Sequence, residues 1–125
     1  MRIGPLKIKA QLYCGDEIAM GPGKADLLDA IDREGSISRA AAAMGMSYRR
    51  AWLLVDSMNR CFTAPLVETH AGGGKASGAR LSDTGRTVLT LYRRLESNLG
   101  LVGDTDPLAM LEAALREEPL AHRAP

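Results

Sequence analysis

Residues 69–81, THAGGGKASGARL, place four glycines and two basic residues, Lys75 and Arg80, in thirteen positions. Such a stretch is suited to binding phosphate, because exposed backbone N–H groups and positive side chains both attract anions. It is not a nucleotide-binding P-loop, G-x-x-x-x-G-K-[ST], since Thr69 stands at the first glycine and Ala76 at the magnesium-binding hydroxyl. Two interpretations stay open: a flexible basic loop that contacts the phosphates of DNA, and a solvated linker.

A second set of residues suited to phosphates and bases is the run SYRR, Ser47 to Arg50. The planar fork of an arginine can bond guanine O6 and N7 together, and a serine or tyrosine hydroxyl can bind a phosphate. Trp52 lies one helical turn beyond Tyr48. We expect its side chain in the core at a junction between helices, with an indole N–H contact to phosphate as the alternative.

The sequence gives little support to catalysis or to metal binding. The sequence contains no Ser-His-Asp pattern, no paired carboxylates in an apolar setting and no cluster of metal ligands. Cys14 and Cys61 are far apart in the chain, and neither shares ligand spacing with His70 or His122. We therefore predict a protein that is not an enzyme, with no metal and no cofactor, in which the cysteines are buried thiols.

The net charge of +1 hides an uneven distribution. Residues 34–98 carry nine Lys or Arg against five Asp or Glu, whereas residues 99–125 carry two against five. The first 33 residues balance at five each. The middle of the chain is therefore where we expect a polyanion such as double-stranded DNA to bind.

The length of 125 residues predicts one small domain. No segment approaches the roughly 18 apolar residues that a membrane span needs, and the N-terminus has no signal peptide. We therefore expect a cytoplasmic protein without a membrane partner. Aromatic residues are scarce, and Ala, Leu and Met supply most of the apolar content, which favours closely packed helices.

Apolar residues at helical spacing predict a helix-turn-helix in residues 36–62. Ser36 or Ser38 can cap a first short helix, and Gly45 can end it in the left-handed conformation. Ser47 then caps a longer helix, whose first turn would face the major groove. The residues expected to point inward are Ile37, Ala40, Ala41 and Met44 in the first helix and Ala51, Leu54, Val55, Met58 and Phe62 in the second.

The segment before it should contain one strand and one helix. Alternation of apolar and polar residues predicts a strand over residues 6–12, followed by a helix that begins near Pro22 and ends at Gly35. The residues expected on one face of this strand are Leu6, Ile8, Ala10 and Leu12.

The segment after it should be a β-hairpin, with strands over residues 66–68 and 79–81. A hairpin that follows a recognition helix is a wing. Lys75 at its tip, with His70 and Arg80 at its shoulders, would reach along the DNA backbone or into the minor groove.

A last long helix is predicted over about residues 82–102, capped by Ser82. Its apolar stripe consists of Val88, Leu91, Tyr92, Leu95 and Leu99. The stripe could pack on the core of its own domain, but its width suits a seam between two copies, and a protein that binds a palindrome requires a two-fold dimer. We thus predict a mainly α (α+β) fold: a winged helix-turn-helix with a dimerisation helix over residues 1–102, and a tail with a short helix over residues 103–125.

Two segments carry a family resemblance: GSISRAAAAMGMSYRRAWLLVDSMN at residues 35–59 and APLVETHAGGGKASGARLSDTGRTVLTLYRRLE at residues 64–96. They resemble the N-terminal DNA-binding domain of molybdate-dependent regulators of the ModE type, a winged helix related to that of LysR-type regulators. The resemblance implies a homodimer on an inverted-repeat operator near genes for molybdate uptake or molybdenum enzymes. It assigns DNA contacts to Ser38, Ser47, Tyr48, Arg49 and Arg50 in the helix-turn-helix and to Lys75 and Arg80 in the wing.

Three questions stay open at this point. The family's longer members continue into molbindin-like domains, and this chain ends about 25 residues after the matching part, so an effector such as molybdate or another oxyanion is undecided. Arg86, Arg93 and Arg94 could meet such an anion across a dimer axis or form a solvated face. The alternative function is a protein-interaction module that binds a partner through the last helix and the acidic tail.

Overall fold

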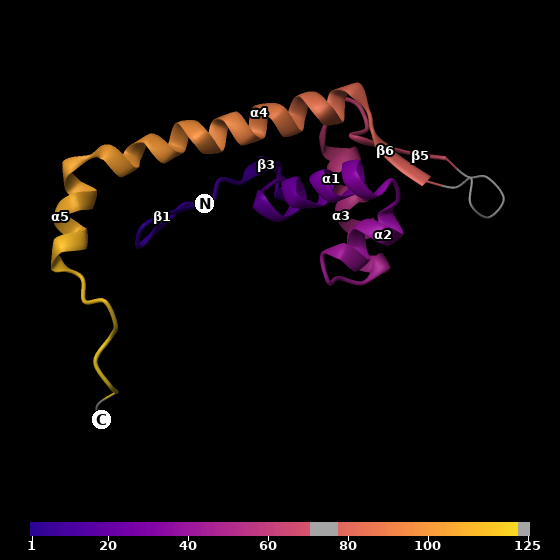
Figure 1. Ribbon diagram of the computed structural model, residues 1–125. Coiled ribbons are helices and arrows are strands. Elements are labelled where there is room, and N and C mark those ends of the chain that lie inside the picture. Colours follow the sequence, from indigo (N-terminus) through magenta and orange to yellow (C-terminus); the bar gives the residue numbers. More distant parts are fainter. Residues whose placement is uncertain (71–77, 123–125) are drawn as a thin grey trace.

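The computed structural model describes residues 1–70 and 78–122, and these form a winged helix-turn-helix (Figure 1). The helical body consists of α1 (Pro22–Glu34), α2 (Ile37–Ala43) and α3 (Tyr48–Cys61). The wing strands are β5 (Val67–His70) and β6 (Gly78–Leu81). The long helix α4 (Asp83–Leu99) crosses the body and continues beyond it toward α5 (Figure 1). The predicted fold class is confirmed.

Local capping sets the limits of the helix-turn-helix. The Ser36 hydroxyl accepts a hydrogen bond of 3.0 Å from the backbone N–H three residues on, and Ser47 accepts the equivalent bond at 3.1 Å. Gly45, between α2 and α3, has a φ of 69°, a left-handed conformation that a side chain would strain. The predicted boundaries are confirmed, and the first cap is Ser36 rather than Ser38.

Small side chains allow the three helices to approach closely. Ala25 and Ala30 of α1, Ala40 of α2 and Ala51 of α3 are fully buried. Of the residues predicted to point inward, Ile37, Ala40, Ala41, Ala51, Val55 and Met58 are buried, and Met44, Leu54 and Phe62 pack against the core from its edge. This packing holds α3 at a defined angle to α2 and leaves its other face to the solvent.

The single strand predicted over residues 6–12 is wrong. The chain instead forms two hairpins, β1 (Arg2–Ile3) with β2 (Leu6–Lys7) and β3 (Leu12–Cys14) with β4 (Glu17–Met20). The carbonyl of Ala10, between them, accepts a 2.7 Å hydrogen bond from the Tyr92 hydroxyl of α4 and so pairs with no strand. Leu12, predicted to point inward, is 40% exposed.

The C-terminal region forms an arm beyond the body. A short 3₁₀ helix, η2 (Gly100–Asp104), leads from α4 into α5 (Asp106–Ala114), and the β1–β2 hairpin lies in the angle between them (Figure 1). Ile3 packs against Gly103 so closely that a Cβ at residue 103 would stand 2.5 Å from the Ile3 side chain. The predicted domain boundary after residue 102 falls within η2 and stays a prediction.

Candidate nucleic-acid interface

The first turn of α3 projects polar and basic side chains from the body. Tyr48 is 56% exposed, and Arg49 and Arg50 are also exposed. The Ser47 hydroxyl oxygen accepts the N-cap hydrogen bond from the Arg50 N–H, which leaves the O–H of the same group able to donate. The two guanidinium groups are therefore the charged part of this surface, and the serine keeps the helix end in place beneath them.

Ion pairs divide the arginines of the middle segment into two groups. Each of Arg60, Arg80, Arg86 and Arg93 lies 3.3 Å or less from a carboxylate. Within the part of the chain that the structure describes, Arg39, Arg49, Arg50 and Arg94 form no ion pair. Three of these four belong to the helix-turn-helix, so the positive charge that a polyanion could use is concentrated there.

Asn59, near the end of α3, positions the wing relative to the recognition helix. Its Oδ1 accepts hydrogen bonds from the backbone N–H groups of Leu66 (2.8 Å) and Val67 (3.1 Å), and its Nδ2 donates to the Val67 carbonyl at 3.2 Å. The side chain thus replaces a strand partner at the start of β5. No local sequence pattern predicts this role for Asn59, although the residue lies in the segment that carries the family resemblance.

The start of α4 holds the wing from the other side. The Ser82 hydroxyl accepts from the Gly85 N–H at 3.0 Å and donates to the Pro65 carbonyl at 2.6 Å. Gly85 touches the chain just before β5, because a Cβ there would stand 2.1 Å from the Leu66 carbonyl oxygen. A side chain at this position would push the wing away from α4.

The wing itself runs back to the body through β6. The Ala79 N–H donates a 2.9 Å hydrogen bond to the Gly35 carbonyl, in the turn between α1 and α2. Arg80, a predicted DNA contact, pairs with Glu68 of β5 at 3.3 Å, and its side chain is 71% exposed. Lys75, the predicted contact at the tip, lies outside the described residues.

A hollow of about 300 Å³ lies between the start of α2, the first two turns of α3 and the wing strands. Its lining includes the side chains of Ser38, Tyr48, Trp52, Thr69 and His70. Trp52 is 47% exposed, so the prediction that it belongs to the core is wrong. The buried position near it is taken by the small Ala51, and the indole turns toward the wing instead.

Two arginines of α4, Arg86 and Arg93, form ion pairs with carboxylates of α1. Arg93 binds Asp26 and Asp29 of α1 at 2.8 and 2.6 Å, and Glu96 of α4 at 2.9 Å. Desolvation alone would lower the pKa of Arg93, but these hydrogen bonds outweigh it and raise the pKa. Arg86 binds Asp32 at 3.1 Å. Arg86 and Arg94 are exposed, as the interpretation of a solvated face expects, whereas Arg93 is half-buried. The carboxylate partners of Arg86 and Arg93 already occupy the positions that an oxyanion would need.

The predicted dimerisation residues differ in exposure. Tyr92 is 2% exposed and bonded to Ala10, so it packs within its own chain and offers no surface to a second copy. Val88 also packs against the core of its own chain. Leu95 and Leu99 are half-buried, and Leu91 is 54% exposed.

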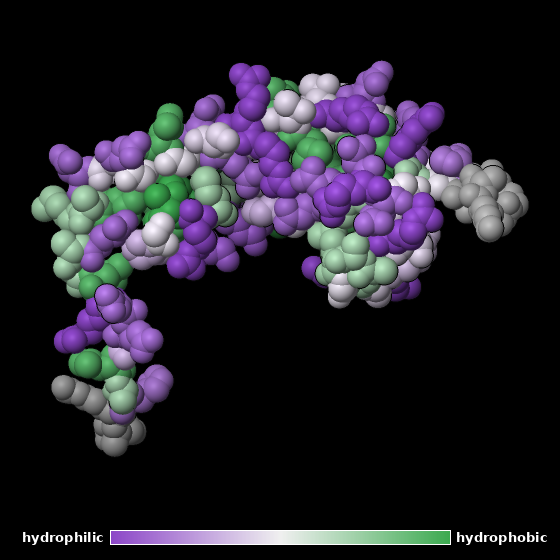
Figure 2. All heavy atoms as spheres, in the orientation of Figure 1, coloured by the Kyte–Doolittle hydropathy of each residue, from purple (hydrophilic) through white to green (hydrophobic). Residues whose placement is uncertain are grey.

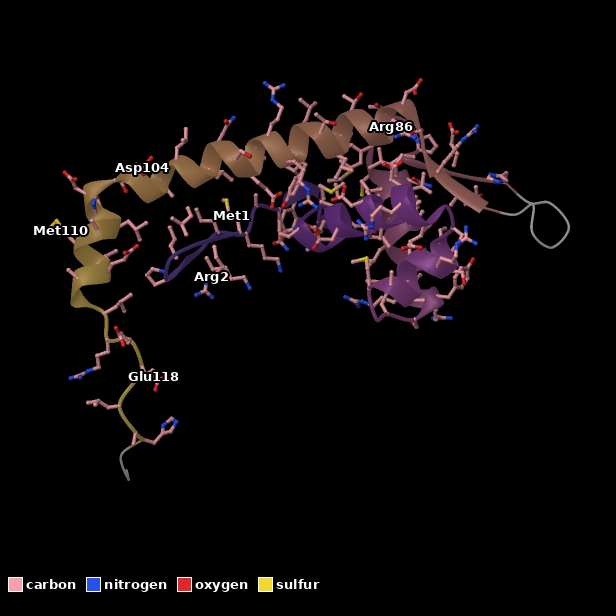
Figure 3. The ribbon with its side chains drawn as sticks, in the orientation of Figure 1. Met1, Arg2, Arg86, Asp104, Met110 and Glu118 are labelled. Carbon is pink, nitrogen blue, oxygen red and sulfur yellow. The ribbon has the colours of Figure 1, made fainter. Side chains whose placement is uncertain are left out.

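Further apolar side chains lie exposed on the arm. They are Leu101, Val102, Met110, Leu111, Leu115 and Leu120. Figure 2 shows apolar residues gathered where the end of α4, α5 and the N-terminal hairpin meet. In Figure 3, Met110 points away from the hairpin, whereas Met1 lies on the inner side of the arm. The arm thus has apolar surface both toward its own chain and toward the solvent.

The two cysteines are neighbours in space although they are far apart in the sequence. The Cys61 thiol donates to Glu17 at 3.9 Å, and burial raises the pKa of this thiol, with Cys14 and Glu17 raising it further. Cys14 is exposed, contrary to the prediction of a buried thiol. The described residues contain no group of three or more His, Cys, Asp or Glu side chains placed to hold a metal ion.

The sequence of α1 to α3, the wing and the start of α4 matches a known family. Residues 24–86, from α1 to the first turn of α4, match the model of the bacterial regulatory helix-turn-helix proteins of the lysR family. The chain belongs to this family. It therefore carries the DNA-binding helix-turn-helix of a transcriptional regulator. Within residues 1–70 and 78–122, no helix has the length and apolar character of a membrane span.

Relatives of known name support the resemblance to ModE. The chain is 45% identical over 78 residues to the molybdenum transport protein ModE of Azotobacter vinelandii, covering 62% of this chain and 29% of that protein. It is 36% identical over 100 residues to the molybdenum-pterin-binding protein MopB of Rhodobacter capsulatus, covering 80% of this chain and 35% of that protein.

A third relative is the DNA-binding transcriptional dual regulator ModE of Escherichia coli K12. It is 33% identical over 116 residues, which cover 88% of this chain and 42% of that protein. The chain thus spans less than half the length of these three relatives.

Proposed function

We propose that the chain binds an inverted-repeat DNA operator as a homodimer, with α3 in the major groove and the wing beside it. The observation that carries the proposal is the position of Arg49 and Arg50. Both are exposed on the first turn of α3, and neither is neutralised by a carboxylate among the described residues. Arginines in this position are suited to paired hydrogen bonds with guanine.

The remaining contacts follow from exposure and chemistry. The hydroxyls of Ser38 and Tyr48 are accessible at the same surface and would bind phosphate oxygens, which sets the register without specifying sequence. Arg80 would exchange its exposed pairing with Glu68 for a phosphate, because a pair this exposed contributes little to stability. Ser47 caps α3 and would donate its hydroxyl proton to a phosphate as well. Lys75 stays a contact predicted from the sequence alone.

The proposed dimer interface consists of exposed apolar residues of α4 and the arm. Leu91, Leu101 and Met110 are 54%, 67% and 73% exposed, and a second copy related by a two-fold axis would cover such residues in both chains at once. A two-fold axis also accounts for recognition of an inverted repeat. Sedimentation equilibrium tests this part: the wild type sediments as a dimer, and Leu91→Glu shifts it toward monomer. A wild type that stays monomeric at the concentrations used for DNA binding contradicts it.

The names of the relatives extend the proposal to genes for molybdenum uptake or use. Enrichment of fragmented genomic DNA on the purified protein, with and without molybdate, tests this. We expect a few inverted-repeat sites near such genes. A difference between the two samples would reveal an effector response.

Arg49→Ala and Arg94→Ala provide a matched pair for the same experiment, since both remove an exposed arginine without an ion pair among the described residues. Only the former lies on α3. We expect Arg49→Ala to lose the enriched sites and Arg94→Ala to keep them. Equal enrichment by all three proteins contradicts the role given to Arg49. No enrichment by the wild type contradicts the proposed DNA binding and favours a winged helix that binds another protein.

A further inference from the structure

The hollow between α3 and the wing carries hydrogen-bond donors and no acid. The residues that line it include five whose side chains can donate a hydrogen bond: Ser38, Tyr48, Trp52, Thr69 and His70. No carboxylate is among the described residues that line it. Donors without a competing acid suit an anion, and the flat faces of Trp52 and Tyr48 suit an apolar ring beside it.

The position of the hollow indicates which anion would bind there. The major and minor grooves of DNA are separated by one sugar–phosphate strand. If α3 enters the major groove and the wing reaches the adjacent minor groove, that strand must cross the space between them. The hollow occupies this space, and its volume of about 300 Å³ exceeds that of a single phosphate group.

We propose that this hollow binds one phosphodiester and its deoxyribose in each half-site, with Trp52 and His70 as the central contacts. The inference rests on the proposed DNA binding and adds two residues to it. The Trp52 indole N–H donates to a phosphate oxygen, and the ring covers the sugar. His70 donates to the same phosphate and adds a positive charge when it is protonated.

The test uses a duplex selected by the genomic enrichment, measured by fluorescence anisotropy. His70→Ala should bind this duplex about threefold more weakly than the wild type, because a hydrogen bond to the phosphate is lost. His122→Ala, which changes the other histidine of the chain, should bind as the wild type does. Wild-type affinity in His70→Ala would overturn the role of His70.

A second measurement locates the phosphate. Duplexes with a single uncharged methylphosphonate at successive backbone positions are compared for the wild type, Trp52→Phe and Tyr13→Phe. One position per half-site should weaken wild-type binding about tenfold, and Trp52→Phe should be much less sensitive at that position alone. Tyr13→Phe, which changes an exposed aromatic residue on β3, should behave as the wild type.

The outcomes separate this inference from the proposed function. If Trp52→Phe and the wild type are equally sensitive to methylphosphonate at every position, the hollow does not bind a phosphodiester. The proposed DNA binding would still stand. Displacement of the duplex by millimolar inorganic phosphate at constant ionic strength would identify a site for a free anion and would also overturn the binding of a phosphodiester in the hollow. Absence of any duplex binding by the wild type would contradict the proposed function itself.

Discussion

The two ends of α3 carry the same kind of residue for different purposes. Arg49 and Arg50 at its start are exposed and form no ion pair among the described residues. Arg60 at its end binds Glu17 at 2.7 Å and Asp56 at 2.9 Å, next to Asn59, which holds the wing. One end of the helix is available to a ligand, and the other is part of the fold.

This difference explains why charge counts alone do not locate a nucleic-acid surface. Residues 34–98 have an excess of basic residues, yet Arg60, Arg80, Arg86 and Arg93 are all paired with carboxylates. What marks the interface is a guanidinium without a partner on an element that DNA can reach. The predictions below test the two ends of α3 separately.

The largest effect is expected at the end of α3. Asn59→Ala leaves the Leu66 and Val67 N–H groups without acceptors, and we expect it to lower the free energy of unfolding by about 2 to 4 kcal/mol. Urea unfolding measures this, with Asn98→Ala, at an exposed asparagine of α4, as the control. Equal midpoints for the two variants would show that Asn59 does not hold the wing.

The next effect is expected at the start of α3. Arg49→Ala should weaken binding to the selected operator by about 1 to 3 kcal/mol and relax the preference at one base pair. Its unfolding midpoint should stay that of the wild type, because the side chain is exposed and no ion pair of the described residues is lost. A large loss of stability with unchanged affinity would reverse the assignment of the two ends.

The smallest effect concerns the pairing of Arg60. Hydrogen bonds from Arg60, and then from Ser57, lower the pKa of Glu17 below its ordinary value of 4.5. The folded state therefore favours the ionised carboxylate, and the stability that this provides is present above pH 4.5 and is lost as the pH falls through the lowered value.

Glu17→Gln should accordingly be slightly less stable than the wild type at pH 7, and the difference should shrink as the pH falls below about 4.5. Urea midpoints measured across this range check the prediction. A difference that stays constant with pH would mean that the carboxylate charge of Glu17 contributes nothing to the fold.

Local signals predicted the helix-turn-helix well. The caps at Ser36, Ser47 and Ser82 and the turn at Gly45 depend on residues within a few positions of one another, so the sequence contains all of their information. The exposed arginines of α3 followed from the same boundaries, because the start of the helix determines which residues form its first turn.

The errors came from contacts between distant residues. Nothing near Ala10 indicates that its carbonyl would bond to Tyr92, 82 positions away, and end the predicted strand. The pairing of Arg93 with Asp26 spans 67 positions. Trp52 is predicted to lie in the core at a junction between helices, but Ala51 fills the buried position and the indole lies beside the wing.

The sequence by itself determined the family, the three helices of the body and the first turn of α3, because helix caps, glycine turns and apolar spacing act over short distances. Only the tertiary structure decided which arginines are neutralised, where the wing stands relative to α3, and that Trp52 and His70 line one hollow. These depend on which distant side chains the packing brings within hydrogen-bonding distance, and no local pattern records that.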